Sequence, residues 1–163
     1  MWIRKTVHRP GNRTGKPDRE TGELLNRVNR TIIRFRGLYS AWSGGHGIGY
    51  NEMLVLYTVR EFGYCTQKQI SDSYLLPRQT VKHVFSVMRR KGLLEGSPAH
   101  RNGREKAFVL SRAGQVLAKP FLDFLNRTKT LAVERFGTER LQEKIRLLEE
   151  YNATLCGALH EIG

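Results

Sequence analysis

The sequence predicts a mainly α-helical protein with one small β-hairpin, which is an α+β class in which helices dominate. The first observation is that apolar residues recur at steps of three and four over most of the 163 residues, the spacing of one helix face. The second is that two short apolar runs, 93–94 and 107–110, flank an Asn-Gly pair, a frequent hairpin turn. The third is a hydrophobic content of 39%, which is enough for a folded core.

The helix predicted between Pro77 and Gly92 is the centre of this plan. Proline suits a first turn, where its missing N–H has no helical partner, and glycine suits a left-handed cap at the end. One face is apolar and consists of Val81, Val84, Phe85 and Met88. The opposite face is cationic and carries Arg78, Gln79, Lys82, His83, Ser86, Arg89 and Arg90. A basic amphipathic helix by itself is also typical of a solvated surface, so its neighbours in the chain decide between the two interpretations.

The segments on either side favour a winged helix-turn-helix. Residues 66–74 predict a short helix with Thr66 as its N-cap. Two short helices joined by a tight turn, the second basic on its outer face, form the helix-turn-helix plan. The hairpin that follows corresponds to the wing of such a domain. Its tip is basic and carries Arg101, Arg104 and Lys106.

Four stretches carry a family resemblance: Thr80-Val81, 88–94, 102–104 and 109–114. They resemble the MarR family of bacterial and archaeal winged-helix regulators, in detail from about residue 53 to residue 117 and in outline over the helical flanks. The resemblance implies a winged helix-turn-helix that binds double-stranded DNA and flanking helices that form a homodimer. It also implies a small phenolic or anionic effector, bound where the dimer helices meet the winged-helix lobes.

The chain departs from the family pattern at three places. The family usually has Asp-Arg-Arg at the wing, where Asn102 and Gly103 stand here and only Arg104 is kept. Ser111 replaces a threonine after the wing and offers an equivalent capping oxygen. His83 lies where the family often has arginine, so a contact to a phosphate or base there would be either weaker or dependent on pH.

DNA contacts follow from the winged-helix geometry, in which the start of the second helix enters the major groove. Glutamine pairs in a two-pronged way with adenine, and arginine with guanine. Contacts to bases and nearby phosphates are predicted for Arg78, Gln79, Thr80, Lys82 and His83. Contacts to phosphates are predicted for Thr66, Gln67, Arg89 and Arg90. The wing residues Arg104, Arg101 and Lys106 complete the predicted interface, with the two arginines directed to the minor groove.

The charge distribution divides the chain into a basic part that would face a polyanion and a C-terminal part with a different role. The net charge is +13, from 28 Lys and Arg against 15 Asp and Glu, and such an excess attracts polyanions. Residues 78–106 hold eight Lys and Arg and two acidic residues. Residues 138–163 hold three Lys and Arg and five acidic residues. Residues 1–17 predict a basic flexible arm, which either binds phosphates or is simply disordered.

The remaining segments are predicted as long helices around a DNA-binding domain at 49–110. Residues 18–48 predict an N-terminal dimerisation helix, which breaks at Ser43 in a Gly-rich turn. Asn51 is the expected N-cap of the next helix, over 50–62. Residues 111–163 predict two C-terminal dimerisation helices that meet at Gly137.

Three of these helices carry apolar stripes that a winged-helix core of this size cannot cover, and monomers rarely expose so much apolar surface. A homodimer would bury them and place two recognition helices one DNA turn apart. The alternative is a three-helix bundle within one chain. The predicted dimerisation residues are Leu24, Val28, Ile32, Phe121, Leu125, Leu141, Ile145, Leu148, Tyr151, Leu155 and Leu159.

The family resemblance implies a ligand pocket, which aromatic residues near the Gly-rich turn could line, and either Arg34 or Arg36 could bind an anion there. Its candidate residues are Arg34, Tyr39, Trp42, His46, Tyr50 and Tyr57. The alternative is that these aromatics are ordinary core. Cys65 is the other regulatory candidate, because a helix N-terminus would lower the pKa of its thiol.

Nothing in the sequence indicates an enzyme, a metal or a cofactor. The five histidines show no ligand spacing, and the two cysteines are far apart. No run of about 18 apolar residues predicts a membrane span, and the N-terminus lacks an apolar signal region. The expected location is therefore the cytoplasm, and the family resemblance implies a prokaryotic cell.

The predicted function is a sequence-specific regulator of transcription that binds double-stranded DNA. It would act as a ligand-responsive repressor, a homodimer on an inverted-repeat operator. The alternative is a winged-helix adaptor that binds RNA or protein, although the basic face lacks the aromatic platform on which single-stranded bases stack.

Overall fold

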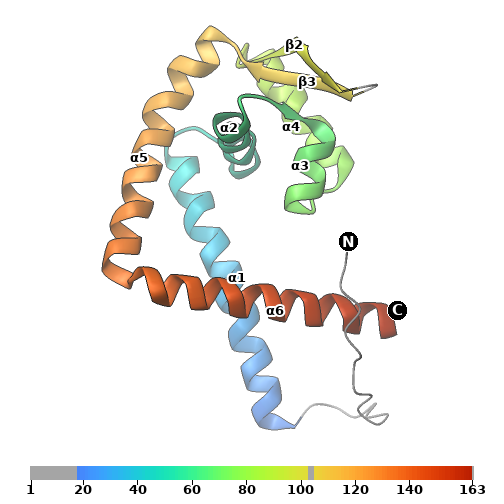
Figure 1. The fold of residues 1–163 in the computed structure, drawn as a ribbon, viewed down its shortest axis with the longest axis vertical. Coiled ribbons are helices and arrows are strands. Elements are labelled where there is room, and N and C mark those ends of the chain that lie inside the picture. The colour runs from blue at the N-terminus through green and yellow to red at the C-terminus, as the bar shows by residue number, and fades with distance from the viewer. Residues whose placement is uncertain (1–17, 103–104, 163) are drawn as a thin grey trace. The chain divides into compact units, whose positions relative to one another are not determined.

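The computed structural model describes residues 18–102 and 105–162 (Figure 1). The predicted basic arm, 1–17, lies outside the described residues. The helices are α1 (Arg19–Gly45), α2 (Tyr50–Phe62), α3 (Gln67–Tyr74), α4 (Arg78–Arg90), α5 (Arg112–Phe136) and α6 (Thr138–Ile162). The strands are β1 (Cys65–Thr66), β2 (Leu94–Asn102) and β3 (Glu105–Leu110). The chain divides into two compact units, 1–47 and 48–163, and each is described by itself.

The predicted fold class is confirmed, with one addition to the hairpin. The strands form a three-stranded antiparallel sheet in the order β1-β3-β2. The sequence analysis missed β1, which pairs Cys65 with Phe108 and Thr66 with Ala107. Two residues are too few to show the alternation that marks a strand in a sequence. This short strand joins the helix-turn-helix to the wing through backbone hydrogen bonds.

The core of the second unit lies between α4, the sheet and the neighbouring helices. The predicted apolar face of α4 is confirmed, because all four of its residues are buried: Val81, Val84, Phe85 and Met88. Phe85 packs edge-to-face on Phe108 of β3, with ring centroids 5.0 Å apart. Ile70 of α3 and Leu56 of α2 are each 1% exposed. Burial of such side chains contributes about 1.5–3 kcal/mol each. Packing of these buried apolar residues therefore fixes the position of α4.

The predicted caps are mostly confirmed, and they fix where α3 and α4 begin and end. The Thr66 hydroxyl accepts a hydrogen bond from the Gln69 N–H over 3.0 Å, which satisfies a free donor of the first turn. Gly92 follows α4 with φ of 69°, a left-handed conformation that glycine adopts without a steric penalty. The Ser111 hydroxyl accepts from the Gly114 N–H over 3.0 Å at the start of α5.

Two predictions about helix ends were wrong. The N-cap of α2 is Gly49 rather than Asn51, and the Glu52 carboxylate accepts a hydrogen bond from the Gly49 N–H over 2.9 Å. The Oδ1 atom of Asn51 is buried and has no hydrogen-bond partner among the described residues. In the first unit, α1 does not break at Ser43 but continues to Gly45. Glycine weakens a helix by only about 1 kcal/mol, so two glycines at the last turn do not end it.

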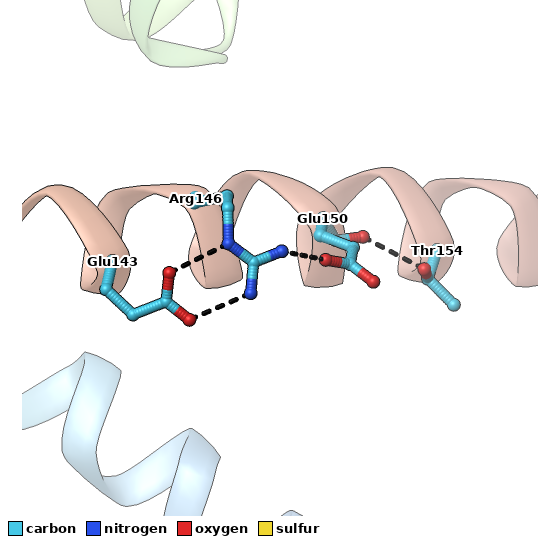
Figure 2. Close-up of polar contacts among 4 residues, drawn as sticks. All are labelled: Glu143, Arg146, Glu150 and Thr154. Atoms are coloured by element: carbon cyan, nitrogen blue, oxygen red, sulfur yellow. Dashed lines mark hydrogen bonds and ion pairs between the residues drawn. The ribbon is translucent and has the colours of Figure 1, made fainter.

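Helix α6 contains no buried residue. Its polar side is stabilised by Arg146, whose guanidinium forms ion pairs with Glu143 at 2.8 Å and Glu150 at 2.9 Å (Figure 2). Such pairs at helical spacing stabilise an exposed helix only weakly, because water screens the charges. The apolar side is open, with Leu159 65% exposed and Ile145 46% exposed. No helix among the described residues is long and apolar enough to cross a membrane.

The predicted dimerisation residues fall into two groups. Phe121 and Leu125 of α5 are 6% and 3% exposed within the single chain, so they belong to its core and leave little surface for a second chain. The others are exposed or half-buried: Leu24, Val28, Ile32, Leu141, Ile145, Leu148, Tyr151, Leu155 and Leu159. The predicted residues of α5 therefore lie deeper than those of α1 and α6, which apolar spacing alone does not reveal.

Candidate nucleic-acid interface

The outer face of α4 presents the predicted basic and polar side chains together. Thr80 is half-buried, and the other predicted residues of this helix are exposed: Arg78, Gln79, Lys82, His83, Arg89 and Arg90. The buried apolar face turns these residues outward, because positions three and four apart share one side of a helix. A rigid helix with an exposed cationic face is suited to bind a polyanion.

A groove lies on one side of α4, between that helix, α3 and β3. We call it the α3-side groove; its volume is about 480 Å³. Five predicted DNA-contact residues line it together: Thr66, Gln67, Arg78, Lys82 and Lys106. The other lining residues are Lys68, Ser71, Val81, Glu105 and Phe108. Residues that are 40 positions apart in the sequence thus share one surface hollow, and its rim is predominantly cationic.

A second groove lies farther along the same side of α4, toward the C-terminal end of the helix and β2. We call it the β2-side groove; its volume is about 730 Å³. Its lining residues are Gln67, Lys82, Phe85, Ser86, Arg89, Arg90, Leu94, Glu95 and Gly96. Gln67 and Lys82 line both grooves, so they lie on the ridge between the two hollows.

A contact with Phe108 of β3 holds the Arg89 side chain in position. Its guanidinium lies over the ring of Phe108, 6.0 Å from the ring centroid, within the range of a cation–π contact. Phe108 in turn packs on Phe85 in the core. The contact joins the end of α4 to β3 and keeps this cation at the protein surface.

Thr66 is a weaker candidate than the sequence suggested. Its side chain is only 7% exposed, and its hydroxyl already caps α3. The backbone N–H of Thr66 donates to Gln69 Oε1 over 3.3 Å. Gln67, which is half-buried on the ridge between the grooves, is better placed to contact DNA.

Three further charged residues belong to this surface, of which the sequence analysis missed Lys68. Lys68 lines the α3-side groove and forms an ion pair with Asp72 at 2.6 Å. The hydrogen bond from Lys68 to Asp72 raises the pKa of the lysine, and the nearby charge of Glu105 adds to this effect. Glu95 and Glu105 each line one groove. The sequence does not show that an acidic residue of a basic segment lines a groove, because its position depends on how the strands fold back.

The wing is described only in part. Strands β2 and β3 pair with Leu94 opposite Leu110 and with Asn102 opposite Glu105. Arg101 lies in β2 near the end of the strand, and Arg104 lies outside the described residues. The predicted minor-groove contacts of these two arginines stay predictions.

The pKa of the Cys65 thiol is not lowered as its place before a helix suggests. The side chain is 0% exposed, and burial raises the pKa of its thiol to about 12. Desolvation disfavours the thiolate, and here it outweighs any effect of the nearby helix start. Cys65 is therefore an inert core residue.

The predicted ligand-pocket residues fall in both units, so each group is described in its own unit. In α1, the rings of Trp42 and His46 lie 4.6 Å apart, and the Nδ1 atom of His46 lies 2.9 Å from the Trp42 carbonyl oxygen. Tyr39 packs edge-to-face on Phe35. In the second unit, Tyr50 opens α2 and the Tyr57 ring lies 4.0 Å from the Lys129 ammonium. The pocket, with Arg34, stays a prediction.

Comparisons with known proteins identify the fold. No protein-family model and no curated protein matches the sequence. Among solved structures, NMB1585, a MarR family regulator from Neisseria meningitidis, is 24% identical and has a TM-score of 0.77 over 86% of this chain and 99% of that chain. Staphylococcus aureus MarR in complex with salicylate and kanamycin is 16% identical, with a TM-score of 0.63 over 86% and 95% of the two chains.

A third similar structure is a complex with DNA. The S. aureus MepR–DNA complex is 15% identical to this chain, with a TM-score of 0.61 over 82% of this chain and 96% of that chain. The described residues show no cluster of His, Cys, Asp or Glu that would hold a metal ion. The family resemblance seen in the sequence is confirmed at the level of structure: the chain has the winged helix-turn-helix fold of the MarR family of transcriptional regulators.

Proposed function

We propose that this protein is a MarR-family regulator of transcription that recognises a specific sequence in double-stranded DNA. The observation that carries the proposal is the cationic outer face of α4, which borders two grooves and lies beside a paired β-hairpin. The MarR-family fold and the similarity to a DNA-bound protein support it. The same features give no support to a catalytic role.

Recognition would begin at the N-terminus of α4, which enters the major groove. Gln79 is exposed beside Arg78, and these two side-chain types make two-pronged contacts with adenine and guanine. Lys82, Arg89 and Arg90 would contact the phosphates along the groove walls. Phosphate contacts dominate affinity and make it steeply dependent on salt.

The protein would act as a homodimer. All apolar residues on one side of α6 are exposed or half-buried in the single chain, and an apolar surface of this extent is typical of an interface. A two-fold dimer places its recognition helices about 34 Å apart, one turn of DNA. The operator would then be an inverted repeat.

A small phenolic or anionic effector would regulate DNA binding, and its release of the DNA would make the protein a ligand-responsive repressor. One similar structure is a complex with salicylate, which is both phenolic and anionic. The predicted pocket residues supply aromatic surface together with an arginine at position 34. The site of action would be the prokaryotic cytoplasm.

Fluorescence anisotropy with the inverted repeats upstream of the protein's own gene tests this function. Each repeat is titrated beside a scrambled duplex of the same length at two salt concentrations. We expect one repeat to bind at least about a hundredfold more tightly than the scramble, within the range of specific recognition. Equal affinity for all duplexes, lost in high salt, would instead favour the RNA- or protein-binding adaptor. Release of the bound repeat by salicylate then tests the effector.

A further inference from the structure

Each groove beside α4 contains one carboxylate from the wing. Glu105, at the start of β3, lines the α3-side groove with Lys68, Arg78 and Lys106. Glu95, in β2, lines the β2-side groove with Arg89 and Arg90. These are the two acidic residues of the segment 78–106. They lie on the paired strands β2 and β3 (Figure 1) and line successive hollows along α4.

Neither carboxylate is explained by the stability of the fold. Glu95 is exposed and Glu105 is half-buried. The ion pairs between described residues join other groups, chiefly at helical spacing. Glu105 does act at a distance, because its charge contributes to the raised pKa of Lys68. Both carboxylates thus add negative charge to hollows that are otherwise cationic.

Negative charge in these two hollows has a consequence for a DNA-binding surface. When a helix lies in the major groove, the phosphates of the groove walls pass on both sides of it. Binding without sequence preference comes almost wholly from such phosphate contacts. A DNA strand that settled with its phosphates inside either groove would hold the protein by charge alone, with α4 away from the base edges.

We propose that Glu95 and Glu105 are specificity-determining residues that repel phosphates from the two grooves and thereby weaken sequence-independent binding. The inference rests on the proposed function and adds a repulsive element to it. Discrimination between two ligands arises as much from repulsion of the wrong complex as from attraction of the right one. In the operator complex, α4 occupies the major groove, and the phosphates stay on the groove rims beside Arg89 and Lys106.

The test compares the isosteric variants Glu95→Gln, Glu105→Gln and the double variant with the full-length wild-type chain. The control is Glu134→Gln on α5, which removes the same charge from an exposed residue outside both grooves. Each protein is titrated by anisotropy with a random duplex and with the tightest repeat at two salt concentrations. Circular dichroism melting establishes that every variant is folded.

We expect the double variant to bind the random duplex at least threefold more tightly than wild type, with a steeper salt dependence, while operator affinity changes less than twofold. The control should change neither affinity by as much as twofold. Three results would overturn the proposal: an equal gain for both duplexes, an equal gain in the control, or a loss of operator affinity, which would make a glutamate a base contact. If wild type prefers no duplex, the proposed function fails by itself, and the random-duplex titration still reports the effect of the carboxylates.

Discussion

Lys91 and Glu52 join the end of the recognition helix to the start of α2. The Lys91 ammonium lies 2.7 Å from Glu52 Oε1, and the glutamate side chain is only 13% exposed. The other oxygen of the same carboxylate accepts the Gly49 N–H. One side chain therefore fixes two helix ends that are 39 residues apart in the chain. The pairing also neutralises Lys91, so this lysine adds less to the cationic surface than its neighbours.

Replacement of Glu52 by glutamine should destabilise the protein by about 1 kcal/mol. The amide retains the hydrogen bond to Gly49 but loses the charge that holds Lys91, and half of the Lys91 side chain is in solvent, which limits the energy of the pair. Urea unfolding of the purified protein measures the change. Glu23→Gln, in an ion pair whose side chains are 93% and 65% exposed, is the matched control and should change stability by less than about 0.5 kcal/mol. Equal effects of the two variants would contradict a special role for Glu52.

Replacement of Gly114 by alanine should destabilise the second unit by about 3 kcal/mol or more, a cost typical of overpacking against backbone. An added Cβ would lie 2.1 Å from the Leu93 carbonyl oxygen, so the start of α5 could not approach the turn after α4. Thermal unfolding followed by circular dichroism checks this. Gly157→Ala on α6 is the control: nothing lies within 4 Å of its added Cβ, and the better helix propensity should stabilise it by about 0.5–1 kcal/mol.

Replacement of Leu75 by glycine should increase stability by about 0.5–1 kcal/mol. Leu75 has φ of 50° and is 90% exposed, so its side chain strains the backbone and buries almost nothing. Urea unfolding measures the gain. Leu76→Gly is the comparison, because Leu76 is half-buried and its loss should destabilise. A loss of stability in the Leu75 variant would show that the side chain packs in the native protein.

Ellman titration of the native protein at pH 8 should detect one reactive thiol, and titration after unfolding should detect two. Cys156 is exposed, whereas Cys65 is buried and burial raises the pKa of its thiol to about 12.

The native state holds the Cys65 proton that the unfolded state loses near pH 9, so stability contributed by this thiol is complete below pH 9 and is lost as the pH rises toward 12. If a Cys65→Ser variant still loses stability at alkaline pH, groups other than this thiol cause that loss.

The sequence predicts the fold well where local chemistry determines it. The four apolar positions of α4, the Thr66 cap and the glycine after the helix each follow from rules that involve neighbours within four residues. The cationic face of α4 is predicted for the same reason. Helix ends are less certain, because Asn51 is a good cap by type but Glu52 reaches the free Gly49 N–H instead.

Features that depend on distant parts of the chain were beyond the sequence. Strand β1 exists only because β3 returns beside it. Cys65 is unreactive because the core closes over it, a fact that its place before a helix does not indicate. Glu95 and Glu105 enter the site because the strands fold back past α4. Phe121 and Leu125 continue an apolar stripe in the sequence but lie at a different depth from the rest of it.

The absence of any buried residue in α6 links the physical state of this helix to the amount of protein in the cell. In the proposed homodimer, a helix with so little burial in its own chain would draw much of its stability from association, and mass action would then make that stability depend on concentration. Freshly made chains at low abundance would expose a frayed C-terminal segment to proteases, and accumulation would protect it. The copy number of the protein would thus be set partly by its own C-terminal helix, independently of any control of its gene.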